Sequence, residues 1–539
     1  MKKIESLFAY ISLFAVITVT GGAIWRFTRP LMTQTYVHEY PANKFGAFLA
    51  SQHAIYINDF DKAAEFSKSF EDTDLPVVLN TTILADFLSG KMPDKADQLK
   101  DEKGAAAHLI YDAYLLSKDD WKGVYDRHKK DDSALTAPLR IWSSVALDNS
   151  ADALKFIDKL KTNDSWKAFV RGQIYAETGK IEAAAKEFSK VSIDFMNIND
   201  YLYIFSFYKH HDMLDAADTL QANFTERPGG MYMLNVKVSA DWENYSGNNN
   251  ALAFSLVQNV SHTQIMMYSD LSLLLLRFAE LSQKGKSQDK KALNYYLGQY
   301  FYNNGVDYQK YFASIDSNSP FYSFAMMKLA EKPDDLDELR AAAEANPLFV
   351  PAVNKLVSRY VQVGDKKKAI AVVDRALKNS NLTETGRAFF LKSRANIHLT
   401  FGDLDDAQKD IRAAADVLPV DAGILAIQSK IWSAEKRELD TAYEYAIALV
   451  RQNPTDIESW DVLGMAVWAR EGAEAGLEVI ERVGQISESC SILFEHLGDL
   501  HMELGNRKLA LDAYLRAVDL SSDGLTVVPH LEKKIKNLK

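Results

Sequence analysis

The residues best suited to metal chemistry are three consecutive polar side chains, His210, His211 and Asp212, which lie between two expected helices. Zinc needs three or four ligands that converge on one point, whereas adjacent side chains in a turn point apart. The sequence offers no evident further ligand close by. We therefore interpret the triplet as a solvated turn, and we expect no metal site and no cofactor.

The other histidines and the single thiol offer little further chemistry. His496 and His501 are five residues apart, so they do not share a helix face, and His501 falls at a position that the helical pattern places in the core. Cys490 is the only cysteine, which excludes an internal disulfide and a Cys-rich zinc site. We expect it to be an inert packing thiol between two helix pairs.

Sequence motifs of the common enzyme classes are also missing. The chain has no GxxxxGK[ST] phosphate loop, no HExxH, no GxSxG and no CxxC. We therefore predict no catalytic residue and no enzymatic activity. Any reaction would need an unrecognised site, and residues 262–315 are the segment with most room for one because they fit the helical pattern described below least well.

Composition indicates a chain that is folded nearly throughout. Of 539 residues, 47% are hydrophobic and 25% are charged, with only 13 Pro and 25 Gly, too few for a linker-rich or disordered protein. A chain of this length forms several domains or an array of repeats. The formal net charge of -11 repels phosphate backbones, so nucleic acid is not an expected partner.

The N-terminus carries an export or anchor signal. Residues 6–25 are uncharged and largely apolar, and about 20 such residues suffice to cross a bilayer. We predict a cytoplasmic N-terminus at 1–5, a transmembrane signal-anchor at 6–25 and a juxtamembrane linker at 26–41. Cleavage after Ala23 is the alternative, although Trp25 and Arg26 make a poor site for signal peptidase.

The charges around this segment leave its orientation open. Lys2 and Lys3 precede it, and Arg26 and Arg29 follow it, so the positive-inside count is a tie. The free amine beside the lysine pair favours an N-terminus inside and the large domain outside. The expected location is the inner membrane with a periplasmic domain. A periplasmic protein released by cleavage and a cytoplasm-facing domain remain alternatives.

Two segments near the C-terminus share one skeleton. The later one has Phe494, Leu497, Gly498, His501, Gly505, Ala510, Tyr514 and Ala517. The earlier one has Trp460, Leu463, Gly464, Val467, Glu471, Gly476, Ile480 and Val483, each 34 residues before its counterpart. Weaker copies precede them, including one with Gly172, Tyr175, Gly179, Ala184 and Phe188. A period of this length predicts stacked supersecondary units.

Small residues at fixed offsets predict pairs of closely crossing helices. Gly464 and Gly498 lie where the two helices of a pair must approach each other, whereas Gly364, Gly402 and Gly505 follow the first helix and open the turn. One such hairpin cannot bury its apolar face alone. Stacking on the next hairpin does so, which is why the pattern recurs.

These residues resemble the tetratricopeptide repeat family, whose consensus places a large residue, Leu-Gly, an aromatic and two alanines at these offsets. The resemblance is good over 316–522 and degenerate over 42–315, and 523–539 reads as a basic capping helix. It implies an all-α, right-handed superhelical solenoid of antiparallel helix pairs, preceded here by the membrane helix. It also implies a scaffold that binds other proteins.

In that family the first helix of each pair lines a concave groove. The corresponding inward positions are Lys392, Asn396, Ile427, Ile431, Asp461, Met465, Trp468, Glu495, Asp499 and Met502. Apolar and acidic side chains dominate, so the resemblance implies a protein or peptide partner with aliphatic and basic residues. Ordinary helix packing with a solvated acidic rim is the alternative, because an error of one residue would move half of these positions into the core.

Some family members hold the C-terminal carboxylate of a chaperone with Lys and Asn, a second Asn, and then Lys and Arg. Here Lys392 and Asn396 match the first pair, but Gln428 replaces the second Asn, and Glu458 and Val462 replace Lys and Arg. An anionic ligand would meet Glu458, so this mode of binding is disfavoured.

Two roles remain for a protein of this layout. The first is a bacterial envelope scaffold that gathers partners for assembly or export, and the second is a cytoplasm-facing quality-control or regulatory adaptor of membrane enzymes. A third possibility, an enzyme with its site in 262–315, would require a perturbed acid/base cluster in a closed pocket there.

Overall fold

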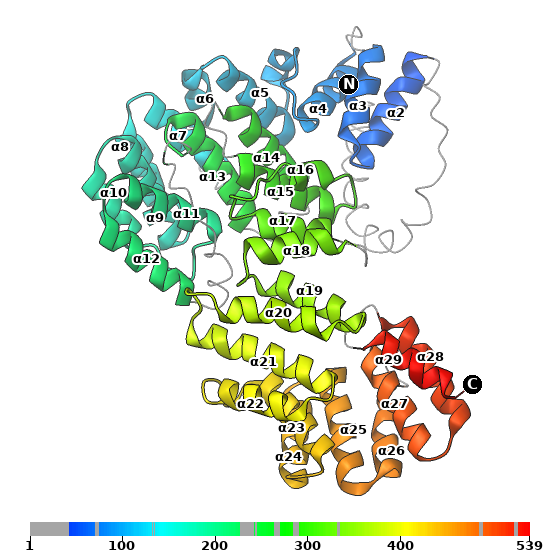
Figure 1. Ribbon diagram of the computed structural model, residues 1–539. Coiled ribbons are helices and arrows are strands. Elements are labelled where there is room, and N and C mark those ends of the chain that lie inside the picture. The colour runs from blue at the N-terminus through cyan, green and yellow to red at the C-terminus, as the bar shows by residue number, and fades with distance from the viewer. Residues whose placement is uncertain are drawn as a thin grey trace. The chain divides into compact units, whose positions relative to one another are not determined.

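The computed structural model describes residues 43–70, 75–131, 133, 135–226, 242, 245–262, 270–283, 290–330, 335–484, 489–521 and 526–538 (Figure 1). The predicted N-terminus at 1–5, signal-anchor at 6–25 and linker at 26–41 lie outside these residues. Among the described helices, none is both long and apolar enough to cross a membrane.

Every element in the described residues is a helix, and contacts divide the chain after Ser89 into two units. The first unit contains α2 (Lys44–Tyr56), α3 (Phe60–Ser67), the 3-10 turn η2 (Lys68–Phe70) and α4 (Pro76–Leu88). The second begins with η3 (Ala96–Asp101) and continues with α5 (Ala105–Ser117), α6 (Trp121–His128), α7 (Ala137–Ala146), α8 (Ser150–Lys159), α9 (Asp164–Glu177), α10 (Ile181–Phe188), α11 (Ile198–His210), α12 (Leu214–Glu226), α13 (Asn248–His262), α14 (Asp270–Ser282), α15 (Lys290–Asn303), α16 (Gln309–Ala313), α17 (Tyr322–Leu329) and α18 (Leu336–Ala345).

The helices that form the site come last. They are α19 (Val350–Gln362), α20 (Lys366–Leu377), α21 (Glu384–Thr400), α22 (Leu404–Ala415), α23 (Ala422–Glu435), α24 (Leu439–Gln452), α25 (Ile457–Glu471), α26 (Ala473–Gly484), α27 (Ser491–Glu503), α28 (Arg507–Asp519) and α29 (Val528–Lys536). Each helix packs on the next, and α21, α23, α25 and α27 also touch one another in sequence. This is the stacking of helix pairs that the sequence predicts, with the first helices of successive pairs forming one layer.

Glycines let the two helices of a pair approach closely. A Cβ at Gly498 would lie 2.4 Å from the ring of Tyr514, and a Cβ at Gly464 would lie 2.3 Å from Ile480. A Cβ at Gly172 would lie 2.4 Å from Phe188. The two partners are sixteen positions apart in all three cases (498 to 514, 464 to 480, 172 to 188), which confirms that α9 and α10 form a degenerate copy of the late repeats.

The turn inside each pair also has one recurring geometry. In α19–α20, α21–α22 and α27–α28 the second residue after the first helix is a glycine with positive φ, as at Gly505 (φ 78°). The α23–α24 turn is an exception, with Lys436 (φ 53°) and Glu438 (φ 47°) in this conformation. Of the early pairs, α9–α10 has Gly179 at this left-handed place, and four others have Asn58, Asp119, Asp148 and Asp212, with φ between 56° and 61°. Asn and Asp tolerate this conformation better than other side chains, so they replace glycine where the repeat is degenerate.

The apolar core is divided along the array. Separate clusters surround Leu356 and Val373, Ile411 and Ile424, and Ile480 and Leu493. Such local cores are expected where each repeat contacts only its neighbours. In α14 the run Leu273 to Leu276 is buried and forms part of the core.

The C-terminal segment 526–538 connects two distant parts of the array. Leu531 and Ile535 of α29 are buried against Tyr514 of α28. Val527 packs against the cluster formed by α18 to α21, and Val527 and Pro529 lie 3.6 Å from the place of a Cβ at Gly364 in the α19–α20 turn. The segment therefore closes one side of the space enclosed by the helices between α19 and α29.

Candidate protein-binding groove

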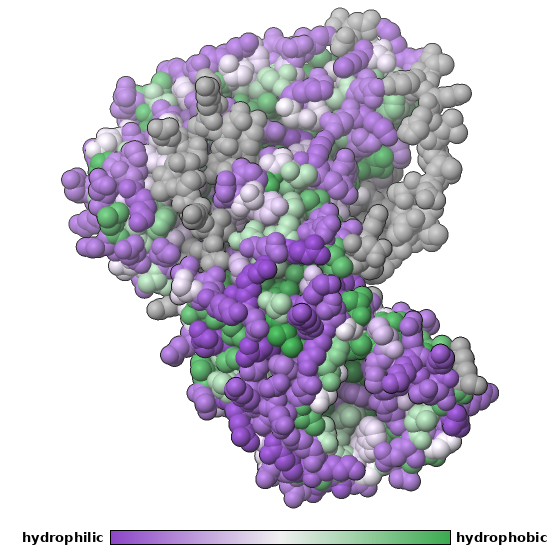
Figure 2. Space-filling model, in the orientation of Figure 1, coloured by the Kyte–Doolittle hydropathy of each residue, from purple (hydrophilic) through white to green (hydrophobic). Residues whose placement is uncertain are grey.

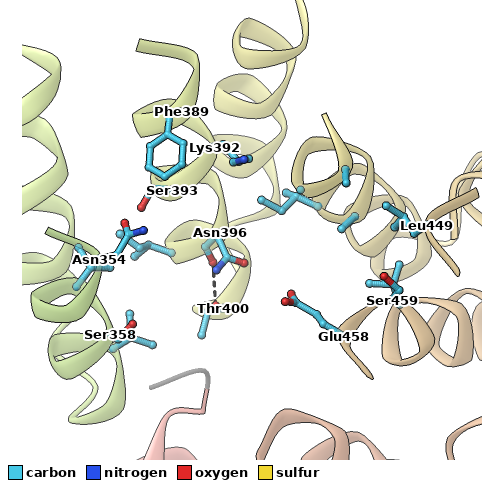
Figure 3. Close-up of a pocket in the computed structure, with 18 of the residues that line it drawn as sticks. Asn354, Ser358, Phe389, Lys392, Ser393, Asn396, Thr400, Leu449, Glu458 and Ser459 are labelled. Carbon is cyan, nitrogen blue, oxygen red and sulfur yellow. Dashed lines mark hydrogen bonds between the residues drawn. The ribbon is translucent and has the colours of Figure 1, made fainter. Parts of the chain in front are cut away.

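Two cavities lie on the inner layer of the C-terminal array. The first has a volume of about 380 Å³ and is formed by α19, α21, α23 and α25. Its lining includes Asn354, Ser358, Phe389, Lys392, Ser393, Asn396, Thr400, Gly423, Ile427, Leu449, Glu458, Ser459 and Val462. Figure 3 shows Asn354, Asn396 and Glu458 reaching into this space from three different helices.

The second cavity adjoins the first. It has a volume of about 540 Å³ and is formed by α21, α23, α25, α27 and the segment at Val527 and His530. Asn396, Thr400 and Glu458 line both cavities, so the two form one continuous groove. In Figure 2 pale and green side chains lie in the hollow of this part of the chain, with hydrophilic purple side chains around it.

The structure brings together six of the ten residues predicted to line the groove. These are Lys392, Asn396, Ile427, Met465, Trp468 and Glu495. The other four are Ile431, Asp461, Asp499 and Met502, and none of them is part of either lining. Ile431 and Asp461 are fully buried. They share a helix face with Ile427 and Met465, but Ile431 belongs to a core cluster and His496 lies against Asp461, so contacts with neighbouring helices bury them.

Two acidic positions on α27 are neutralised within the chain. Lys534 of α29 places its Nζ atom 2.9 Å from Glu495 Oε1 and 2.7 Å from Asp499 Oδ1. Asp499 also accepts a hydrogen bond of 2.7 Å from the hydroxyl of Tyr514. Sequence reasoning missed this triad, although the basic capping helix was the available signal. The groove is consequently less acidic than the list of its residues suggests.

A second charge network lies beneath the second cavity. His496 Nδ1 lies 2.7 Å from Asp461 Oδ1, and Lys430 Nζ lies 3.2 Å from Glu458 Oε1. Burial alone would lower the pKa of His496, but the carboxylate of Asp461 outweighs it and raises that pKa above its usual value. Burial opposes the charge on Asp461 as well, yet His496 and Lys430 hold its pKa below the usual range. Each buried charge in this network therefore has an opposite charge near it.

The first cavity contains Lys392 and Asn396, the two residues that match the family's carboxylate clamp, and also groups that would repel an anion. Lys392 Nζ lies 2.9 Å from Asp421 Oδ1, so its charge is already paired. The carboxylate of Glu458, whose side chain is 52% exposed, faces the same space (Figure 3). A ligand carboxylate would meet this negative charge, in agreement with the sequence argument against chaperone-tail binding.

The residues considered for metal chemistry occupy ordinary structural positions. Helix α11 ends at His210, and Asp212 has the left-handed conformation of the turn before α12. Within the described residues, no three His, Cys, Asp or Glu side chains form a group that could hold a metal ion. His501 is buried, as its repeat position predicts, and Cys490 is half-buried against the α26–α27 cluster.

The described part of 262–315 forms α14, α15 and α16, which pack on one another in order. Its perturbed groups include buried tyrosines, for example Tyr296, whose pKa burial raises well above its usual value. Arg277 is buried as well, with Nη1 2.6 Å from Glu280 and Nη2 2.8 Å from the hydroxyl of Tyr311. These contacts hold helices together, and helical pairs continue through the segment whose register the sequence left undefined.

Residues 493–523, which cover α27 and α28, match the family model of the tetratricopeptide repeat. This last helix pair is therefore of tetratricopeptide type. It contains the Gly498 and Tyr514 contact, and Gly464 with Ile480 repeats that geometry in the preceding pair. The described residues thus form a helical repeat array.

Solved structures with a similar course of helices include the APC/C hetero-tetramer Cut9-Hcn1, with 13% identity, a TM-score of 0.32, and coverage of 92% of this chain and 96% of that one. Yeast Tom70 is similar with 12% identity and a TM-score of 0.27, and the match covers 92% of this chain and 96% of that one. A tetratricopeptide repeat protein from Parabacteroides merdae has 12% identity and a TM-score of 0.33, and the match covers 54% of this chain and 99% of that one. No curated protein sequence matches. Likenesses this distant carry no argument about partners.

Proposed function

We propose that the groove formed by the two cavities binds a polypeptide segment that carries aliphatic and basic residues. The observation that supports this most directly is the continuity of the cavities through Asn396, Thr400 and Glu458. A segment laid along the groove would contact three or four repeats at once.

The chemistry of the lining supports this class of ligand. Phe389 and Ala426, which are half-buried, offer apolar surface in the first cavity, and Met465 and Ile492 do so in the second. Methionine adapts its shape to different partners. Aliphatic side chains of a ligand would fill these places, as the anchors of peptides do in other grooves.

The charges at the groove favour basic over acidic segments. Lys392 and Lys430 are paired with Asp421 and Glu458, so they are not available to an incoming carboxylate. Glu458 keeps half of its side chain in contact with solvent and can accept a further cation. A basic residue therefore gains an attractive partner at the groove, whereas an acidic one meets repulsion.

Selection from a random dodecapeptide library on the purified full-length chain tests this proposal. Asn396→Trp would fill the place where the cavities join, and Glu444→Trp is the matched control on α24, because Glu444 is exposed and lines neither cavity. The selected peptides should bind the wild type and the control equally and lose at least tenfold in affinity for Asn396→Trp. Equal binding to all three would refute the proposal.

We further propose that residues 6–25 anchor the chain in the inner membrane of a bacterium, with the array in the periplasm, where it serves envelope assembly or export. The support is the uncharged run of membrane-spanning length behind Lys2 and Lys3. A cytoplasm-facing adaptor of membrane enzymes is the alternative. Fusions after Lys539 to a reporter active only outside the cytoplasm, and to one fluorescent only inside, decide between them. An inside signal would overturn the envelope role.

A further inference from the structure

The second cavity contains a tryptophan whose ring is held from two sides. Trp468 packs against the cluster of Ile480, Leu493 and Leu500, and its indole Nε1 donates a hydrogen bond of 3.1 Å to Glu503 Oε2. On the neighbouring helix a Cβ at Gly476 would lie 2.6 Å from Cβ of Trp468. The indole is therefore fixed between α25 and α27, with one part of it facing the cavity.

Glu503 differs from the other carboxylates of this cavity in its partner. Glu458 is paired with Lys430, and Glu495 is paired with Lys534. Glu503 accepts from the neutral indole of Trp468, and within the described residues no cation lies close enough to form a salt bridge with it. Because an indole N–H donates in the plane of the ring, the exposed carboxylate of Glu503 lies at the edge of the indole. A cation over the ring face near this edge would be attracted by both groups.

The rest of the lining fits the stem of a basic side chain. Met465, Leu399 and Ile492 provide apolar surface between the indole and the joining point at Asn396. Lysine and arginine bury their methylene stems along such surfaces and leave the charged head at the polar end. The volume of about 540 Å³ leaves room for one such side chain and part of the backbone that carries it.

We propose that this cavity is a specificity pocket for one arginine or lysine side chain of the bound segment, with the cation over Trp468 and beside Glu503. The inference rests on the proposed function, and it adds the position at which the basic side chain of the segment binds. Lys436, at the exposed C-cap of α23, lines the same cavity and would repel a cation placed next to it, so the position of the cation is the one at Trp468 and Glu503.

The test uses a peptide recovered by the wild type and a copy in which its conserved arginine is replaced by citrulline, which has nearly the same shape and no charge. Affinities are measured for the wild type, Glu503→Gln, Trp468→Leu and two controls, Glu444→Gln and Trp460→Phe. Trp460 lies on the same helix as Trp468 and lines neither cavity. Glu503 is exposed, so its replacement leaves the core intact.

The expected result is a loss of about 3- to 30-fold with Trp468→Leu, the range of a cation–aromatic contact, and of about 2- to 5-fold with Glu503→Gln. Replacing arginine by citrulline should weaken binding to the wild type more than binding to Glu503→Gln, because the variant lacks the carboxylate that attracts the arginine charge. The controls should bind as the wild type does.

Some results would refute the pocket and leave the groove as the binding site, and another would refute both. An equal effect of citrulline on the wild type and Glu503→Gln would refute the pocket alone. Peptides that depend on Asn396 but lack a basic residue would refute the pocket and the preference for basic segments, and would leave the groove as the binding site. Peptides that bind Asn396→Trp as well as the wild type would refute the proposed function itself.

Discussion

Replacing Gly498 by alanine tests the close helix contact on which the repeat depends. The added Cβ would lie 2.4 Å from Cε1 of Tyr514, whereas carbon atoms prefer about 3.5–4.0 Å, so the ring or the helix has to shift by about 1 Å. The ring has little freedom to move, since its hydroxyl donates to Asp499 and Lys534 Nζ lies 5.3 Å from the ring centre. Overpacking of this kind costs ~1–3 kcal/mol.

Alanine also favours the helix by up to ~1 kcal/mol relative to glycine, so we expect a net loss of about 1–2 kcal/mol. Gly484 is the matched control, because it ends α26 and nothing lies within 4 Å of its added Cβ. Gly484→Ala should leave stability unchanged or raise it slightly.

Hydrogen exchange of the full-length chain, followed on peptides from α27 and α28, is the suitable assay because a repeat array opens locally. Gly498→Ala should speed exchange there roughly 5- to 30-fold, and Gly484→Ala should not. Unchanged protection in Gly498→Ala, or an equal loss in both variants, would refute the packing argument.

Three further predictions concern charges and turns. The pKa of His496 is raised in the folded chain, so its contribution to stability is complete below the unfolded pKa and is lost as pH rises through the folded pKa. The protection of amides in α25 and α27, taken relative to their intrinsic exchange rate at each pH, should therefore fall from pH 6.5 upwards, and His496→Gln should remove that fall. Lys534→Ala leaves Glu495 and Asp499 unpaired and should lower thermal stability by about 2–4 kcal/mol, whereas the exposed Lys533→Ala should change it by less than ~0.5 kcal/mol; equal effects would contradict the triad. Asp148→Gly should raise the stability of the α7–α8 pair by up to ~1 kcal/mol because Asp148 has φ 57°, and a loss on exchange analysis would show that the side chain itself stabilises the turn.

The helix pairs could be predicted from the sequence because their determinants are local. A glycine and a large residue sixteen positions later define the contact at Gly498, Gly464 and Gly172, and that spacing is visible in the printed chain. The early turns were harder to recognise, since Asn58 and Asp119 occupy the left-handed position that glycine marks later. An Asn or Asp directly after an apolar helix was the signal.

The groove could be predicted only in part because its lining depends on contacts between distant residues. Periodicity predicted Asn396 and Trp468 as groove positions, and both line the second cavity, but it could not show that His496 lies against Asp461. Nor could it show that Lys534, 35 residues after Asp499 in sequence (499 to 534), neutralises it. These pairings arise from the stacking of whole helix pairs. The periodicity of one helix shows which face is apolar, but not which residues of other helices contact it.

Photocrosslinking of a selected peptide tests the central claim most directly. A photoreactive residue at position 396, where the two cavities join, is compared with one at position 444 on the outer surface of α24. The account predicts a crosslink at 396 that excess unlabelled peptide abolishes, and little or none at 444. A crosslink at 444 without one at 396 would place the binding surface outside the groove and contradict the account.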